Sequence, residues 1–266
     1  MIGREGASDP LLEGGPTWRR AYHLINDDRR ALLLPLVVTQ LPAAIFSSAA
    51  LFVLLWRVFP EVDYQEIPRA EEQPRNYLLG LLVIAGAYWM FTLIGVAGTI
   101  VATRSIAAGE AVSLSSALDP GFTRMGGLLV LGAILLGLVI ATLFGLIVLL
   151  YVLWRFGLVL QQYLIGGSGP YGALGKSWLL LRGRMLRFAG MMLTLVPLSI
   201  SAVAIGLFAG GLMALPLTLF EPSRVLDLAG ISIVGAVLGP FAVLVSAYIA
   251  VATTLFYLQV RAELDD

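Results

Sequence analysis

Long apolar runs alternate with short polar segments along the chain, and this pattern predicts membrane-spanning helices. A helix needs about 20 apolar residues to cross a bilayer, and five runs reach that length. The run over residues 126–166 is about 40 residues long, so as one helix it would measure about 60 Å, roughly twice the hydrocarbon thickness. We therefore divide it into two spans. The predicted fold is an all-α bundle of six transmembrane helices at about residues 31–58, 77–102, 126–146, 149–167, 188–220 and 229–258.

The charged segments between the runs predict the side of the membrane on which each one lies. Lys and Arg accumulate in cytoplasmic loops. The N-terminal segment carries arginines, the loop over residues 59–76 is acidic, and the segment over residues 176–187 has four basic residues and no acid. Only an even number of crossings between Arg124 and Lys176 keeps both inside. We expect cytoplasmic termini, a disordered tail over residues 1–16, and one six-span membrane domain over residues 17–264.

Three predicted cytoplasmic segments resemble one another. Each is a short amphipathic stretch with basic residues that leads directly into a pair of spans, and we expect each to be a helix in the headgroup plane. Two interpretations stay open: a unit repeated three times, or the ordinary placement of basic residues inside. The segments cover residues 18–30, 114–124 and 171–187.

Composition agrees with an integral membrane protein and excludes several chemistries. The 266 residues are 59% hydrophobic and 13% charged, where soluble domains carry about 25% charged residues. The net charge of zero argues against a nucleic-acid partner. The chain has no cysteine and a single histidine, His23, which excludes disulfides, thiolate sites and histidine-rich metal sites. We predict no metal and no cofactor.

A glycine-rich segment imitates a phosphate-binding loop. It ends in Gly175-Lys176-Ser177, but a P-loop needs a glycine five residues before Gly175, where Pro170 stands, and no strand precedes it. We reject nucleotide binding and predict a turn that leads into a helix.

Polar residues within the predicted spans are few. Arg155 is the one charge within the run over residues 126–166. It either faces a bundle interior or cavity, or extends to the outer interface. Gln161 and Gln40 are expected to hydrogen-bond between helices.

Small residues recur at four-residue spacing in the predicted spans, which favours close helix packing within one bundle over a dimer face. They are Gly137, Ala141 and Gly145, then Gly206 and Gly210, then Gly235 and Gly239.

The run Trp154-Arg155-Phe156-Gly157, about ten apolar residues, and then residues 172–183 resemble the membrane domain of some glycerophosphoryl diester phosphodiesterases and of many stand-alone bacterial membrane proteins. Residues 107–113 with Ala117, and residues 254–261, resemble further parts of that domain. Gln259 replaces its usual Asp, and Glu263 replaces a basic residue. The positions in step are Ala173, Leu174, Ser177, Trp178, Leu181 and Gly183.

This resemblance implies the membrane module alone, because catalysis in those enzymes belongs to a separate soluble barrel domain. It also implies a multi-pass protein of the bacterial cytoplasmic membrane.

We expect a non-enzymatic module that serves as a scaffold or subunit of a membrane complex, or that binds lipid headgroups. The alternative is a transporter or permease-like component, in which Arg155, Gln161 and Gln40 converge on a polar cavity. An intramembrane enzyme lacks support, because no acid, base and nucleophile cluster at one depth. The candidate lipid or partner face consists of Lys176, Ser177, Trp178, Arg182, Arg184 and Arg187.

Overall fold

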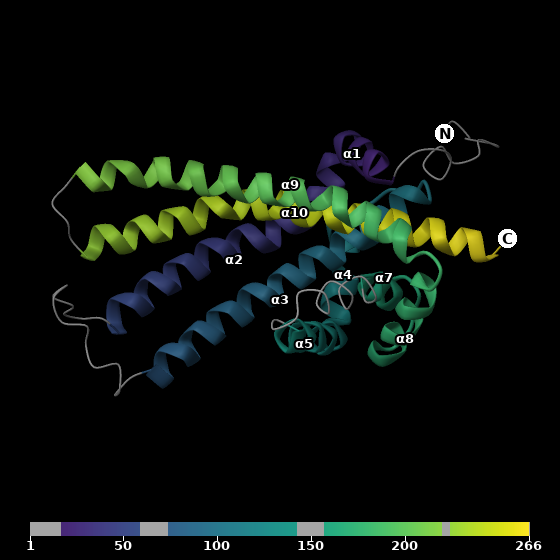
Figure 1. The fold of residues 1–266 in the computed structure, drawn as a ribbon, viewed down its shortest axis with the longest axis horizontal. Helices are drawn as coiled ribbons and strands as arrows, with labels where there is room; N and C mark the ends of the chain where they lie inside the picture. Colours follow the sequence, from purple (N-terminus) through teal and green to yellow (C-terminus); the bar gives the residue numbers. More distant parts are fainter. Residues whose placement is uncertain (1–16, 59–73, 143–156, 220–223, 266) are drawn as a thin grey trace. The chain divides into compact units, whose positions relative to one another are not determined.

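The chain is helical throughout the part that the structure describes. The computed structural model describes residues 17–58, 74–142, 157–219 and 224–265. Of these residues 91% are helical and none forms a strand (Figure 1). The all-α prediction is confirmed for these ranges. The count of six spans stays a prediction, because residues 143–156 fall outside the described ranges.

Within the described ranges, four helices contain stretches long and apolar enough to cross a bilayer. The helices are α2 (Arg29–Val58), α3 (Pro74–Ala107), α9 (Met185–Ala214) and α10 (Arg224–Asp265). A 3₁₀ turn, Leu215–Leu219, extends α9. The spanning stretches are Arg29–Leu54, Leu79–Ala107, Met185–Leu217 and Ala229–Leu264.

A fifth candidate span is a bent pair of helices. Helices α4 (Leu114–Thr123) and α5 (Met125–Thr142) meet at an angle of 68°. Ser113 caps α4 in a reciprocal capping box, in which its hydroxyl accepts from the Ser116 N–H at 3.2 Å and its own N–H donates to Ser116 Oγ. This cap fixes the start of α4 where the sequence predicted the second short segment.

Helices lie on all three segments expected to be amphipathic. They are α1 (Thr17–Asp27), α4 and α8 (Pro170–Leu181). The buried residues of α1 are Thr17, Ala21 and Leu24, at the spacing of one helix face. A further short helix, α7 (Val159–Leu164), precedes α8.

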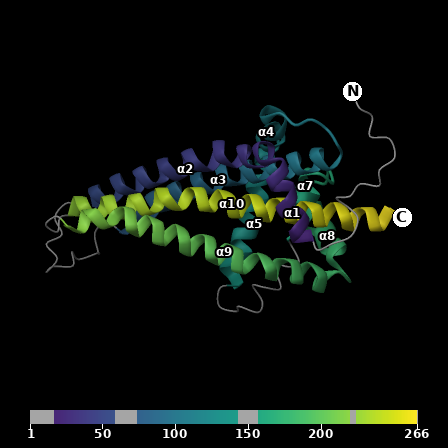
Figure 2. The same cartoon turned by 90° about the horizontal axis from the view of Figure 1, so that it is seen from above.

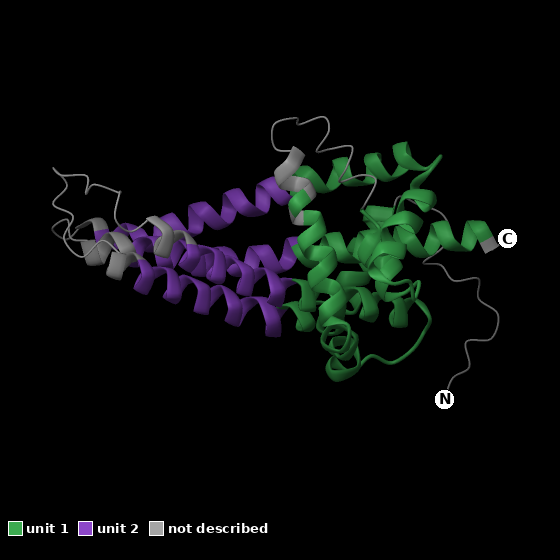
Figure 3. Ribbon diagram, turned by 90° about the horizontal axis from the view of Figure 1, so that it is seen from below, with its two compact units in different colours: residues 1–36, 93–198, 246–266 green, residues 37–92, 199–245 purple. Residues whose placement is uncertain are grey.

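The chain divides into two compact units, coloured separately in Figure 3. Unit 1 consists of residues 1–36, 93–198 and 246–266, and unit 2 of residues 37–92 and 199–245. Helices α1, α4, α5, α7 and α8 therefore belong to unit 1. The boundaries between the units fall within α2, α3, α9 and α10.

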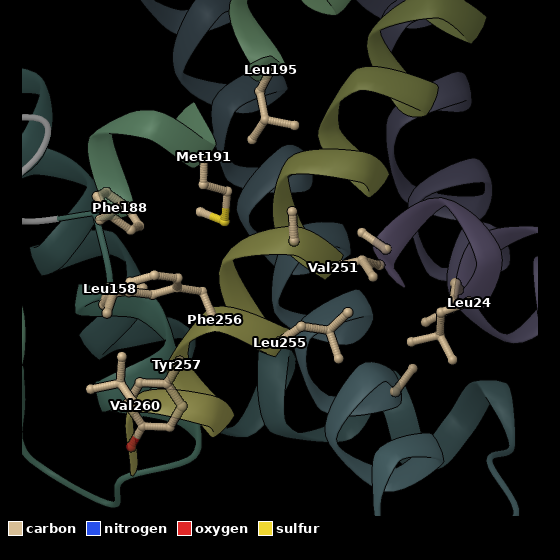
Figure 4. Packing of buried hydrophobic residues seen from close by; sticks show 14 of the residues in the cluster. Leu24, Leu158, Phe188, Met191, Leu195, Val251, Leu255, Phe256, Tyr257 and Val260 are labelled. Atoms are coloured by element: carbon tan, nitrogen blue, oxygen red, sulfur yellow. The ribbon is translucent and has the colours of Figure 1, made fainter. Parts of the chain in front are cut away.

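The core of unit 1 surrounds the last turns of α10. Phe256 and Tyr257 are each 1% exposed, and Figure 4 shows them among Phe188, Met191 and Leu158. The rings of Phe188 and Phe256 meet edge to face with 5.2 Å between centroids. This contact joins α9 to α10.

Unit 2 is held by close packing at glycines. Its segments of α9 and α10 lie side by side in both ribbon views (Figures 1 and 2). A Cβ added at Gly210 would lie 2.9 Å from Val234 Cα, and one at Gly206 would lie 2.8 Å from Leu238 Cδ2. Gly235 and Gly239 are close to α2 in the same way. The packing predicted for these four glycines is confirmed.

Gly137 does not share this role among the described residues, because a Cβ there would meet nothing within 4 Å. Ala141 and Gly145 belong to the part of the chain whose side chains are not described.

Candidate functional site

Helix α8 carries part of the predicted basic face. Pro170 occupies its first turn after the N-cap Gly169, and Gly167 turns the chain with φ +65°. The predicted turn into a helix is confirmed. Ala173, Ser177 and Leu181 form the buried side of α8.

The six predicted face residues divide by exposure. Lys176, Arg182 and Arg187 are exposed, and Trp178 is 37% exposed. Ser177 is 0% exposed, so it lies on the inner side of α8 and not on the face. Helix periodicity explains this, because Ser177 follows Ala173 by four residues.

The link between α8 and α9 arranges the basic residues around one carboxylate. Gly183 allows the turn with φ +81°, a conformation that side chains with a Cβ rarely adopt. Arg184 Nε lies 3.2 Å from Glu263 Oε2, and Arg187 Nη1 lies 2.6 Å from Glu263 Oε1. Glu263 therefore holds the start of α9 against the end of α10.

A pocket of about 420 Å³ opens beside this ion pair. Helices α7, α8 and α10 and the α8–α9 link supply its walls. Three cations line it, and no carboxylate is among the lining residues that the structure describes. The lining residues are Gln162, Gly166, Lys176, Leu179, Leu180, Arg184, Tyr257, Arg261 and Leu264. We call it the basic pocket.

Buried hydrogen bonds fix the inner wall of the basic pocket. The Tyr257 hydroxyl donates to Gln162 Oε1 at 3.0 Å, and Gln162 Nε2 donates to Ser168 Oγ at 3.0 Å. Gln162 is 6% exposed and Tyr257 is 1% exposed. The amide therefore uses both its donor and its acceptor to connect α7 with α10 and with the turn before α8.

Gln161 connects the same helices at a second position. Its Nε2 donates to Thr253 Oγ1 at 2.7 Å, and that hydroxyl donates to the Ile249 carbonyl at 2.7 Å. Among the described residues, Gln161 Oε1 is buried with no hydrogen-bond partner. The amide lies between helices, as the sequence predicted for it.

The structure does not test whether the other two predicted polar contacts join Gln161. Gln40 is 1% exposed and belongs to unit 2, whereas Gln161 belongs to unit 1. Arg155 lies outside the described residues. The predicted convergence of these three residues on a cavity therefore stays a prediction.

Gln259, near the end of α10, contacts an arginine of α1. Gln259 Oε1 accepts from Arg20 Nη2 at 3.1 Å. Burial and, second, the nearby charge of Arg187 lower the pKa of Arg20 from its usual value. This hydrogen bond joins α1 to α10.

Sequence reasoning missed Arg261 and Tyr257 as members of the basic pocket. The signal was present, because Tyr257, Arg261 and Leu264 are spaced to share one face of α10. The spacing does not show which helices pack against that face of α10. In the structure, α7 and α8 do so and complete the pocket.

Comparison of the chain with protein-family models, with curated proteins and with solved structures finds no match. The site is therefore interpreted from its own geometry.

Proposed function

We propose that this protein is a non-enzymatic integral membrane module that binds anionic lipid headgroups at its cytoplasmic face. The observation that carries the proposal is the basic segment formed by α8, the α8–α9 link and the first turn of α9. Among the described residues, Glu263 is the one acid bonded to it, through Arg184 and Arg187. The cations are Lys176, Arg182, Arg184 and Arg187.

The helix ends that belong to unit 1 support a shared membrane side for the basic segments. Helices α2 and α9 begin in unit 1, and helices α3 and α10 end in it. All three short helices predicted to be interfacial belong to unit 1. The positive-inside rule then assigns that side to the cytoplasm.

The shape of the second short segment supports an interfacial position. The 68° bend separates α4 from α5, as expected where a helix in the headgroup plane turns into a span. Trp18 and Trp178, on α1 and α8, are 36% and 37% exposed. Partly exposed tryptophans are typical of the membrane interface.

Magnitudes favour lipid binding by this segment. Each basic residue near an anionic surface contributes about 1 kcal/mol of attraction. Of the four cations, Glu263 pairs only with Arg184 and Arg187 and offsets part of their charge. Lys176 and Arg182 therefore keep their full contribution to the attraction of anionic lipid. We expect a moderate, salt-dependent preference for anionic lipid.

The transporter alternative has less support. Gln161 and Gln162 are buried, and their amides bond to Thr253, Tyr257 and Ser168. Amides used in this way hold helices together and leave few groups for a passing solute.

Lipid enrichment in nanodiscs tests the proposal. The full chain is reconstituted with a mixture of neutral and anionic lipids, and the lipids that remain around the protein after detergent exchange are counted. We expect anionic lipid to be enriched for the natural chain. We expect the enrichment to fall when Lys176, Arg182, Arg184 and Arg187 are all changed to Gln.

Two further variants make the test independent of folding. Lys176→Gln with Arg182→Gln changes only exposed side chains and is expected to lower the enrichment. Arg30→Gln with Arg104→Gln removes the same charge from exposed sites elsewhere in unit 1 and is expected to lower it less. No enrichment for the natural chain, or equal losses in the two double variants, would overturn the proposal.

A further inference from the structure

The basic pocket gathers three cations that are far apart in the sequence. Lys176 comes from α8, Arg184 from the α8–α9 link, and Arg261 from α10. Lys176 makes no hydrogen bond or ion pair with any residue that the structure describes. Arg182 and Arg187, which belong to the same basic segment, do not line the pocket.

The walls of the basic pocket differ in polarity. Its inner wall holds Gln162 and Tyr257, which bond to each other. Its apolar rim includes Leu179 and Leu264, which are 63% and 55% exposed. A ligand that fits both parts has a charged head and an apolar tail.

We propose that the basic pocket is a binding site for the phosphate monoester headgroup of a membrane lipid. The phosphate oxygens would accept charge-assisted hydrogen bonds from Lys176, Arg184 and Arg261, and the acyl chains would leave across Leu179 and Leu264. The proposal rests on the proposed function, which it narrows from a charged face to one site and one headgroup.

Charge selects a monoester over a diester. A phosphate monoester carries about −1.5 to −2 at pH 7, whereas a diester headgroup such as that of phosphatidylglycerol carries a single charge. Three cations line the pocket, so a headgroup with nearly two negative charges is attracted more strongly than a headgroup with one. The volume of about 420 Å³ lies within the range of roughly 300–1,000 Å³ for small-ligand sites.

Native mass spectrometry of the full chain in a neutral detergent tests the site. The protein is titrated separately with phosphatidic acid, with phosphatidylglycerol and with the neutral lipid phosphatidylcholine, and the phosphatidic acid complex is then exposed to inorganic phosphate. Lys176→Gln and Arg261→Gln change exposed pocket residues, and Arg182→Gln is the matched control from the same basic segment. Lys176→Arg keeps the charge in the pocket.

We expect phosphatidic acid to bind about fivefold tighter than phosphatidylglycerol, because one additional charge is recognised. Lys176→Gln and Arg261→Gln are each expected to weaken phosphatidic acid binding about fivefold. Arg182→Gln and Lys176→Arg are expected to change it less than twofold.

Three results would overturn the site. Equal losses for Arg182→Gln and Lys176→Gln would show a diffuse charged face, which removes the pocket and leaves the proposed function standing. Absence of any preference for anionic over neutral lipid would contradict both the pocket site and the proposed function. Displacement of the lipid by inorganic phosphate at equal concentration would show a site for a soluble phosphate and not for a lipid.

Discussion

Glu263 is the residue on which the charge of the basic pocket depends. Its carboxylate contacts Arg184 and Arg187 and is 37% exposed. The carboxylate therefore partly neutralises the positive charge of Arg184, and Arg184 also lines the pocket. A ligand phosphate and this carboxylate compete for the same guanidinium.

Glu263→Gln is expected to strengthen binding of phosphatidic acid by up to about fivefold, because it removes one nearby negative charge. Lipid titration by native mass spectrometry measures the change. Glu110→Gln, at an exposed position before α4, is the control and should leave affinity unchanged. Weaker binding in Glu263→Gln would mean that the carboxylate positions Arg184 and does not compete with the ligand.

The Tyr257 hydroxyl forms a hydrogen bond in the wall of the basic pocket that we expect to stabilise the fold. Tyr257→Phe removes the hydroxyl that donates to Gln162 Oε1 and leaves a buried acceptor with one partner fewer. We expect a loss of about 1–2 kcal/mol in the free energy of unfolding, measured by denaturant titration in detergent. Tyr171→Phe, on a side chain that is 76% exposed, should have no effect. Equal stability of the two variants would contradict the assigned role of the Tyr257 hydroxyl.

At the scale of elements, the starts of α4 and α8 could be predicted from sequence, whereas α7 lies within the span expected over residues 149–167. Pro170 and the glycines before it indicate the start of α8, and Ser113 and Ser116 supply the cap of α4. The helix ends are local features, set by residues within a few positions. The basic pocket is not local, because Gln162 and Arg261 meet only when α7 packs against α10.

Ser177 is a second example of a feature that depends on tertiary packing. The sequence predicted a helix there, but it did not show which side of the helix is buried. From the sequence, we assign Ser177 to the basic face together with its neighbours Lys176 and Trp178. Its own position, one turn after Ala173, lies on the buried side of α8. Distinguishing the two sides of so short a helix requires knowledge of what covers it.

Neighbouring glycines in α9 provide a matched test of helix packing in unit 2. A Cβ at Gly210 would lie 2.9 Å from the backbone Cα of Val234, whereas a Cβ at Gly211 would meet no described atom within 4 Å. Gly211→Ala should be neutral or gain up to about 1 kcal/mol of stability from helix propensity. Gly210→Ala should lower stability, because backbone atoms must separate. Thermal unfolding in detergent distinguishes the two, and equal shifts would contradict the packing.

At the scale of the whole molecule, lipid binding by the basic pocket requires that α8 and the end of α10 lie on the cytoplasmic side. The apolar spans and their order could be predicted from the runs alone, and four of them are confirmed as helices with a fifth in the bent pair. The hairpin proposed between residues 126 and 167 rests on loop charge. Its middle, residues 143–156, lies outside the described ranges.

Cysteine labelling is well suited to test the topology, because the chain contains no cysteine. Single substitutions Glu66→Cys, Ser116→Cys and Tyr171→Cys are treated in intact cells with a membrane-impermeant maleimide. We expect labelling at position 66 in intact cells, and at positions 116 and 171 only after lysis. Labelling of position 171 from outside would place α8 on the wrong side of the membrane.

The most direct test of the central claim is native mass spectrometry of the protein extracted gently from its own membrane. We expect a retained phosphate lipid on each chain, at reduced occupancy in Lys176→Gln and Arg261→Gln and at unchanged occupancy in Arg182→Gln. A stoichiometric protein partner with no retained lipid would contradict it and would make the basic face a protein-binding surface.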